Sequence, residues 1–134
     1  MIYKNIIAIA IGGALGTIGR GLLNMHSLWI GLPIATVIEN IVGSFLLGLF
    51  TGWLIHKRTK DWVKTGIGVG FCGGFTTMST LAADTLLLYM DSSLLHSFVY
   101  LFVSLFAGIT LGFIGLILGS KWGESEVKRK VVNH

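Results

Sequence analysis

Four long apolar stretches constrain the fold of this 134-residue chain more than any other feature. They cover residues 3–23, 32–55, 63–90 and 94–119. Each reaches the ~20 residues that an α-helix needs to cross a hydrocarbon core of about 30 Å. Hydrophobic residues make up 53% of the chain and charged residues only 12%, which is too apolar for a soluble domain of this length. The sequence therefore predicts an all-α membrane protein in which residues 1–134 form one domain of four transmembrane helices, with a short tail at residues 120–134.

The positive charges indicate how these helices are oriented. Nine cations lie at the first, third or last boundary of the spans, and only Arg20 lies toward the opposite face. The nine are Lys4, Lys57, Arg58, Lys60, Lys64, Lys121, Lys128, Arg129 and Lys130. With four spans these boundaries share one face, and Lys and Arg accumulate on the cytoplasmic side. We therefore expect a multi-pass protein of the inner (cytoplasmic) membrane with cytoplasmic N and C termini, a cytoplasmic loop at 56–62, a frayed end at 128–134 and no nucleic-acid partner.

Glycines recur at a spacing of four residues in all four stretches. They are Gly12 and Gly16, Gly48 and Gly52, Gly66, Gly70 and Gly74, Gly108 and Gly112, and Gly115 and Gly119. Because lipid provides little hydrophobic force between helices, small residues at this spacing favour close contact between backbones. We expect the helices to pack tightly and to turn their polar residues toward protein or water.

Polar residues of the second stretch fall on one face of a helix. Thr36, Asn40, Gly43 and Thr51 follow the helical period, and Glu39 borders this stripe. Amide and carboxyl groups inside a span are costly and mark either a functional site or a buried partner. Asn40 therefore either lines a pathway or bonds to another helix. The Glu39 carboxyl is either kept neutral by burial or paired with a cation of a partner.

The third stretch contains the sequence GFCGGFTTMST at residues 70–80, where three glycines and four hydroxyl groups interrupt an apolar run. Irregular backbone at membrane depth is tolerated only where it is buried in protein or lines a cavity. We therefore predict a helix that is broken between Gly73 and Thr80. A break offers carbonyl oxygens to a small hard cation such as sodium, and amides and hydroxyls to an anion. The alternative is an unbroken glycine ridge whose hydroxyls bond along the helix.

Two further groups of residues carry polar chemistry. Tyr100, Ser104 and Gly108 share one face of the fourth stretch and form either a polar track or an interfacial aromatic with a local cap. Arg20 ends the first stretch, where its guanidinium either attracts anions to a vestibule or extends to lipid headgroups. The sequence contains no pairing of nucleophile and base, no phosphate loop and no metal-ligand cluster, so no enzymatic function is expected.

Three motifs, in this order, resemble the CrcB/Fluc fluoride channel family. They are GGALGTIGR at residues 12–20, T-x-x-x-N-x-x-G-S-F at 36–45 and GFCGGFTTMST at 70–80. The resemblance covers the whole chain, including Tyr100 and Ser104. It implies an antiparallel dimer of four-helix subunits, passive fluoride export, two ion pathways along the subunit interface and a central structural sodium ion.

The resemblance also assigns residues to these sites. The backbone carbonyls of Gly73 and Thr76 match those that hold the sodium. The matching ion-pathway residues are Arg20 near a vestibule, Asn40, the hydroxyls of Thr77, Ser79 and Thr80, and the face of Tyr100 and Ser104. Fluoride is strongly hydrated, so a selective pathway has to replace its water with hydroxyl, amide and ring-edge donors. An inside-negative membrane potential then drives export by about 2.3 kcal/mol per 100 mV.

Three features depart from the family pattern. Met78 and Leu81 stand where the family usually carries phenylalanine rings that meet the anion, and Glu39 stands where an apolar residue is usual. The charge bias favours a single orientation, whereas many relatives insert in both and so have dual topology. We therefore expect one half of a two-chain channel, with an inverted homologous partner that supplies ring edges, although a homodimer stays open. The alternatives are a non-conducting accessory or scaffold subunit and a small proton-coupled exporter that uses Glu39.

Overall fold

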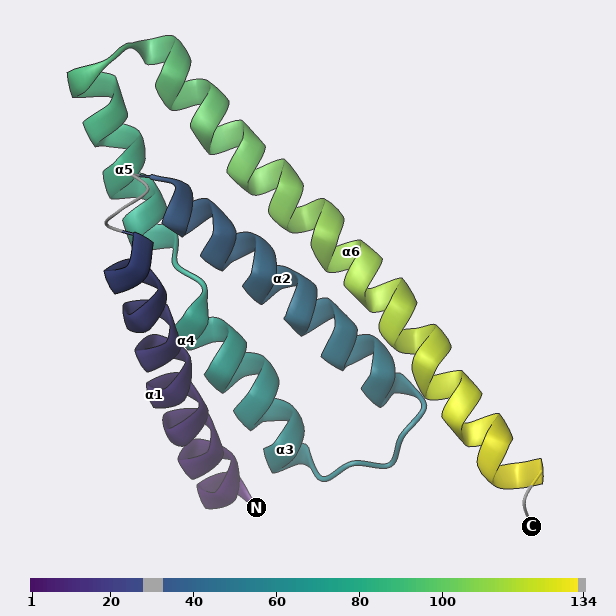
Figure 1. Ribbon diagram of the computed structural model, residues 1–134. Helices are drawn as coiled ribbons and strands as arrows, with labels where there is room; N and C mark the ends of the chain where they lie inside the picture. The colour runs from purple at the N-terminus through teal and green to yellow at the C-terminus, as the bar shows by residue number, and fades with distance from the viewer. Residues whose placement is uncertain (28–32, 133–134) are drawn as a thin grey trace.

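The computed structural model describes residues 1–27 and 33–132, and it is built from helices (Figure 1). The elements in chain order are α1 (Ile2–Ser27), α2 (Ile34–Ile55), α3 (Asp61–Thr65), the π-helix η1 (Gly66–Cys72), α4 (Gly73–Phe75), α5 (Met78–Asp91) and α6 (Leu94–Val132). Three helices within the described residues, α1, α2 and α6, are long and apolar enough to cross a membrane. No strand occurs in the described residues, so the predicted all-α class is confirmed. The predicted start of the second span, residue 32, lies outside those residues.

The third apolar stretch is divided into α3, η1, α4 and α5. The chain leaves the helix at Thr76 and Thr77, whose φ and ψ angles of −76° and 156°, and −147° and 126°, are extended. A new helix then starts at Met78, and Thr77 caps it by accepting a hydrogen bond from the backbone N–H of Thr80 at 3.2 Å. The predicted break between Gly73 and Thr80 is therefore confirmed, and the alternative of an unbroken ridge is wrong.

Two sets of helices make up most of the packing. Helix α2 lies along α6, and α1 lies along the run of α3, η1 and α4, as Figure 1 shows. Glycines let the backbones touch in both sets, and we call these two lines of contact the glycine seams. A Cβ atom at Gly48 of α2 would collide with the carbonyl of Gly112 in α6, and a Cβ atom at Gly12 of α1 would collide with the carbonyl of Gly66 in η1. The glycine ridges that the sequence predicts are thus used for packing within this chain.

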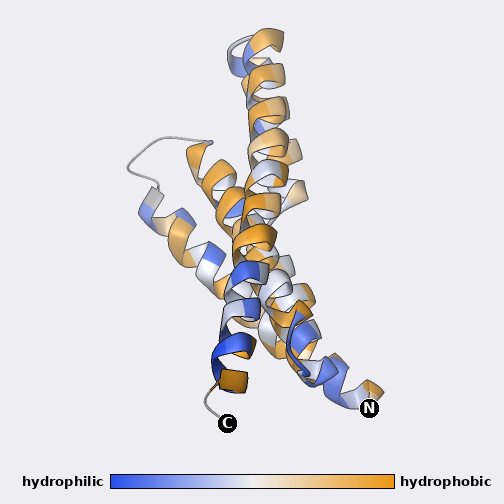
Figure 2. Ribbon diagram, turned by 90° about the vertical axis from the view of Figure 1, so that its right-hand side faces the viewer, coloured by the Kyte–Doolittle hydropathy of each residue, from blue (hydrophilic) through white to orange (hydrophobic). Residues whose placement is uncertain are grey.

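The start of α1, the end of α6 and the loop between α2 and α3 lie at one end of the molecule (Figure 1), and hydrophilic residues gather at this end in Figure 2. Met1 and Lys4 border the same hollow as Thr59 and Trp62. This arrangement agrees with the sequence pattern, in which the cations of the first, third and last boundaries share one face.

The C-terminal tail is helical up to Val132, so the expected fraying is wrong for the described part of the tail. Glu126 forms an ion pair with Lys57 of the loop between α2 and α3. Glu124 forms another with Lys128, one turn later in α6, at 2.6 Å. Charge pairs of this kind stabilise the exposed end of a helix. The last two residues of the tail lie outside the described residues.

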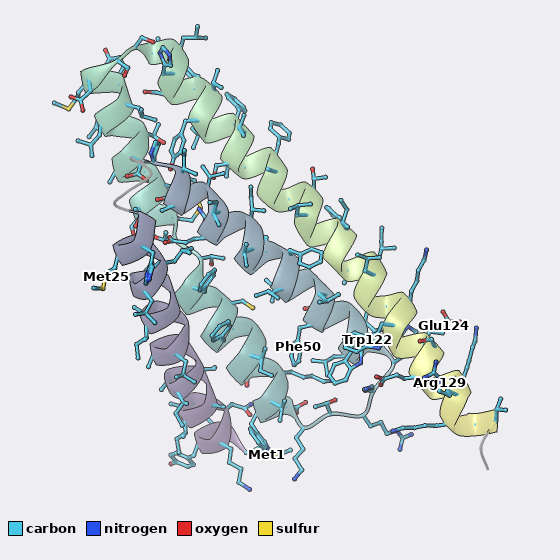
Figure 3. The ribbon with its side chains drawn as sticks, in the orientation of Figure 1. Met1, Met25, Phe50, Trp122, Glu124 and Arg129 are labelled. Atoms are coloured by element: carbon cyan, nitrogen blue, oxygen red, sulfur yellow. The ribbon has the colours of Figure 1, made fainter. Side chains whose placement is uncertain are left out.

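An apolar hollow of about 320 Å³ separates the two sets of helices near the charged end. Phe50 of α2 and Trp122 of α6 point toward it (Figure 3), and Phe71 of η1 also lines it. The ring of Trp53 lies 5.8 Å from that of Trp122. This aromatic and aliphatic lining suits a hydrocarbon chain better than an ion, so a site for ions has to lie elsewhere.

Candidate functional site

Asn40 of α2 holds the break of the third stretch in place. Its Nδ2 donates to the carbonyl of Thr77 at 2.9 Å, and its Oδ1 accepts from the backbone N–H of Thr77 at 2.7 Å. This reciprocal pair satisfies both backbone groups of an extended residue, which a continuous helix would otherwise satisfy. Asn40 therefore bonds to another segment, which is one of its two predicted roles.

The same contacts redirect two backbone N–H groups. In a continuous helix the N–H of Thr77 would bond to the carbonyl of Gly73, but here it donates to Asn40 Oδ1. Likewise the N–H of Thr80, which would bond to the carbonyl of Thr76, donates to Thr77 Oγ1. The carbonyls of Gly73 and Thr76 therefore keep lone pairs for other ligands, and such oxygens suit hard cations.

Three hydroxyl groups gather at the start of α5. Thr77 Oγ1 lies 3.2 Å from Ser79 Oγ and 3.1 Å from Thr80 Oγ1. Thr77 is buried, whereas Ser79 is exposed at the surface of the single chain and Met78 is 68% exposed. The three hydroxyls lie at a helix N-terminus, where the helix dipole favours negative charge. The fold thus brings the predicted hydroxyl ligands together and turns one side of them outward.

A cavity of about 220 Å³ adjoins these hydroxyls, between α2, α5 and α6. Its apolar lining includes Met78 and Leu81, and its polar lining comes from Asn40, Ser44, Thr76, Thr77 and Ser104. Ser104 is 1% exposed, and its hydroxyl has no hydrogen-bond partner among the described residues. Because buried polar groups are nearly always paired, a free hydroxyl in a cavity suits a small polar ligand or ion.

Tyr100 belongs to a second polar cluster, one helical turn from Ser104. Asp84 Oδ2 accepts from the Thr36 hydroxyl at 2.6 Å and from the Tyr100 hydroxyl at 3.0 Å. Thr36 and Asp84 are 3% and 6% exposed, so the cluster lies inside the chain. Sequence reasoning missed Asp84. Its signal was present, since an acidic residue within an apolar stretch is costly and points to a buried partner.

Glu39 is the least accessible of the predicted site residues. It is 0% exposed, and neither carboxyl oxygen has a hydrogen-bond partner in the part of the chain that the structure describes. The charges of Arg20 on α1 and Asp84 on α5 act on it. Glu39 therefore faces the interior of the chain, where a partner chain does not reach it without rearrangement.

Comparison with known proteins shows the family of the chain. The family model described as CrcB-like protein, Camphor Resistance (CrcB) matches residues 7–116. A Halalkalibacterium halodurans protein named Fluoride-specific ion channel FluC 2 is 55% identical, over 88% of this chain and 87% of its own. A Bacillus subtilis protein of the same name is 41% identical, over 85% and 86%. A Thermus thermophilus protein named Fluoride-specific ion channel FluC is 38% identical, over 84% and 93%. The family model covers most of the chain, and this chain therefore belongs to the CrcB family.

Proposed function

We propose that this chain is a subunit of a fluoride-specific channel that passively exports fluoride across the cytoplasmic membrane, with both termini in the cytoplasm. The observation that carries the proposal is the polar break beside a cavity between three helices, which Asn40, Thr77 and Ser104 line. The names of the relatives, which match this chain over most of its length, support fluoride as the ion.

The chemistry of the site suits a dehydrated anion. The Asn40 amide keeps a second N–H after its bond to Thr77, and the hydroxyl of Ser104 is free to donate. The hydroxyls of Ser79 and Thr80 complete a set of donors that replace water around fluoride. Because these donors are neutral, they compensate the loss of hydration without trapping the ion. The membrane potential supplies about 2.3 kcal/mol per 100 mV to drive export.

A structural sodium ion fits the break in the third stretch. Its ligands would include the carbonyls of Gly73 and Thr76, whose usual N–H partners bond elsewhere. When bound, sodium supplies a fixed positive charge that stabilises the break. A Cβ atom at Gly73 would meet nothing within 4 Å, so this site opens at the outer surface of the chain. The proposed second subunit would complete the set of ligands.

A partner subunit in inverted orientation is part of the proposal. Gly73, Met78 and Ser79 are exposed next to irregular backbone, and lipid cannot satisfy such backbone at membrane depth. A protein surface therefore has to cover the break. We propose a homologous chain whose aromatic rings compensate for Met78 and Leu81, and a second copy of this chain is the alternative.

Ion efflux from liposomes tests the function and the partner. The chain is purified alone and together with a co-expressed homologous chain, and release of fluoride is compared with release of chloride. We expect fluoride release to exceed chloride release strongly for the two chains together and weakly for the single chain. Family-like fluoride rates from the single chain would reject an obligate partner. Two chains that release neither ion would support an accessory or scaffold function instead.

The ring-edge argument has its own test, for which the structure distinguishes two positions. Met78 is 68% exposed, so Met78→Phe places a ring at the outer surface without overpacking. We expect it to raise fluoride efflux from the single chain about tenfold, because a ring edge is an additional partner for the anion. Leu81 is 1% exposed, so Leu81→Phe is the control that lowers stability by about 1–3 kcal/mol through overpacking. No gain from Met78→Phe would contradict the argument.

A further inference from the structure

Two carboxyl groups are buried in this subunit, and their hydrogen-bond surroundings differ. Asp84 Oδ2 accepts two short hydrogen bonds, from Thr36 and Tyr100. Glu39 is 0% exposed and has no hydrogen-bond donor for either oxygen among the described residues. Thr36, one helical turn before Glu39 in α2, donates to Asp84 and not to Glu39. Glu39 is therefore the buried carboxyl that no donor stabilises among the described residues.

A carboxylate in a medium of low dielectric is costly unless donors or a cation stabilise its charge. Glu39 is buried without a donor to either oxygen among the described residues, so burial disfavours its charged form.

The other titratable or charged groups that face Glu39 come from two elements. Arg20 of α1 acts on it, but the two form no ion pair in the described structure. Tyr100 of α6 donates its hydroxyl to Asp84 rather than to Glu39. The short segment α4 (Gly73–Phe75) carries no titratable side chain. No cation among the described residues therefore offsets a negative charge on Glu39 at contact distance.

We propose that Glu39 holds a proton and that this proton regulates anion passage. Glu39 precedes Asn40, whose side chain holds the break and lines the cavity. Loss of the proton to water places a negative charge on the residue next to Asn40 and repels an entering anion. The effect on fluoride rests on the proposed channel function, whereas the proton on Glu39 does not.

Infrared spectroscopy tests the proton without any transport. The chain is reconstituted in lipid, with its partner where one is required, and the C=O stretch of neutral carboxylic acids is recorded at neutral pH. We expect a band that disappears in Glu39→Gln and on raising the pH of the unmodified chain. The matched control, Glu124→Gln, changes an exposed acid in the tail and should leave the band intact. Absence of the band in the unmodified chain, or its persistence in Glu39→Gln, overturns the proposal.

Fluoride efflux from liposomes tests the regulation, between about pH 6 and pH 9, with leakage of hydrogen fluoride subtracted using protein-free liposomes. We expect efflux to fall by up to about tenfold per pH unit once Glu39 loses its proton. Glu39→Gln should remove this dependence and retain the rate seen at low pH. Equal pH dependence in both proteins would contradict the regulatory role. A band without fluoride efflux under any condition would leave the proton in place and reject the channel function instead.

Discussion

The two halves of α2 pack by different means. In the half near the charged end, Gly48 and Gly52 bring the backbone of α2 against the backbone of α6. In the other half, Thr36 and Asn40 hold α5 and the break through side-chain hydrogen bonds, and Glu39 is buried between them. The first seam depends on shape and leaves no room for a side chain. The second depends on polar pairing.

This difference indicates that the buried amide and carboxyl groups of α2 have a role other than helix packing. A membrane helix can be packed by glycines alone, so buried amides and carboxyls are not needed for association. The polar half of α2 borders the cavity that contains Asn40 and Ser104. Its polar residues therefore serve the site, whereas the glycine half serves as the scaffold. Substitutions in the two halves should have different effects.

The largest effect is expected in the glycine half. A Cβ atom at Gly48 would collide with the carbonyl of Gly112, and backbone atoms cannot give way as side chains do. We expect Gly48→Leu to destabilise the protein by about 3 kcal/mol or more and to abolish a monodisperse preparation in detergent. Gly21→Leu is the matched control, since a Cβ atom there meets nothing within 4 Å. If Gly48→Leu and Gly21→Leu have the same melting temperature, close backbone contact does not determine the packing of α2 against α6.

The next effect is expected in the polar half. Asn40→Ala leaves the carbonyl and N–H of Thr77 without their partners, at about 1–3 kcal/mol for each buried group. Because this bond holds the break beside the cavity, we expect fluoride efflux to fall by about tenfold or more. Thermal melting measured on the same sample separates lost folding from lost conduction. Full fluoride efflux from Asn40→Ala would show that the hydrogen bonds between Asn40 and Thr77 are not needed for anion passage.

The sequence predicts the scaffold better than the polar contacts. Glycine spacing, apolar length and the hydroxyl-rich break are local properties, so the seams and the break between Gly73 and Thr80 could be predicted. The link between Asp84 and Tyr100 joins two segments, and periodicity within one helix carries no information about it. Tyr100 and Ser104 share a face of α6 but contact different groups, because one helical turn separates them.

A smaller effect is expected for the cluster around Asp84. Tyr100→Phe removes one of the two hydroxyl donors to Asp84 and keeps the ring. We expect a loss of about 1 kcal/mol in stability, because Thr36 still donates to the same oxygen. Thr36→Val is the matched variant, and the double substitution should cost more than the sum of the two, since it leaves Asp84 without either donor. Simple additivity in thermal melting would show that the two hydroxyls act independently.

The smallest effect is expected at the charged end of α6, where both an ion pair and close backbone packing hold the helix. The hydrogen bond and charge of Lys57 hold the pKa of Glu126 below its ordinary value. A carboxyl whose pKa is lowered by folding stabilises the fold above the ordinary value of about 4.3 and loses this contribution as the pH falls through the folded value. We therefore expect Glu126→Gln to speed hydrogen exchange in residues 124–132 at neutral pH but not in acid.

The glycine seam reaches the same end of α6 and provides the competing explanation. A Cβ atom at Gly123 would lie 2.7 Å from the carbonyl of Trp53, so close backbone contact continues beyond the apolar stretch. The control Glu124→Gln removes a pair whose side chains are more exposed, 74% for Lys128 and 50% for Glu124, and it should change exchange less. If Glu126→Gln leaves exchange unchanged at neutral pH, the seam alone holds this end. Close backbone packing, as in the glycine half of α2, would then stabilise this end of α6, and the ion pair of Glu126 would not.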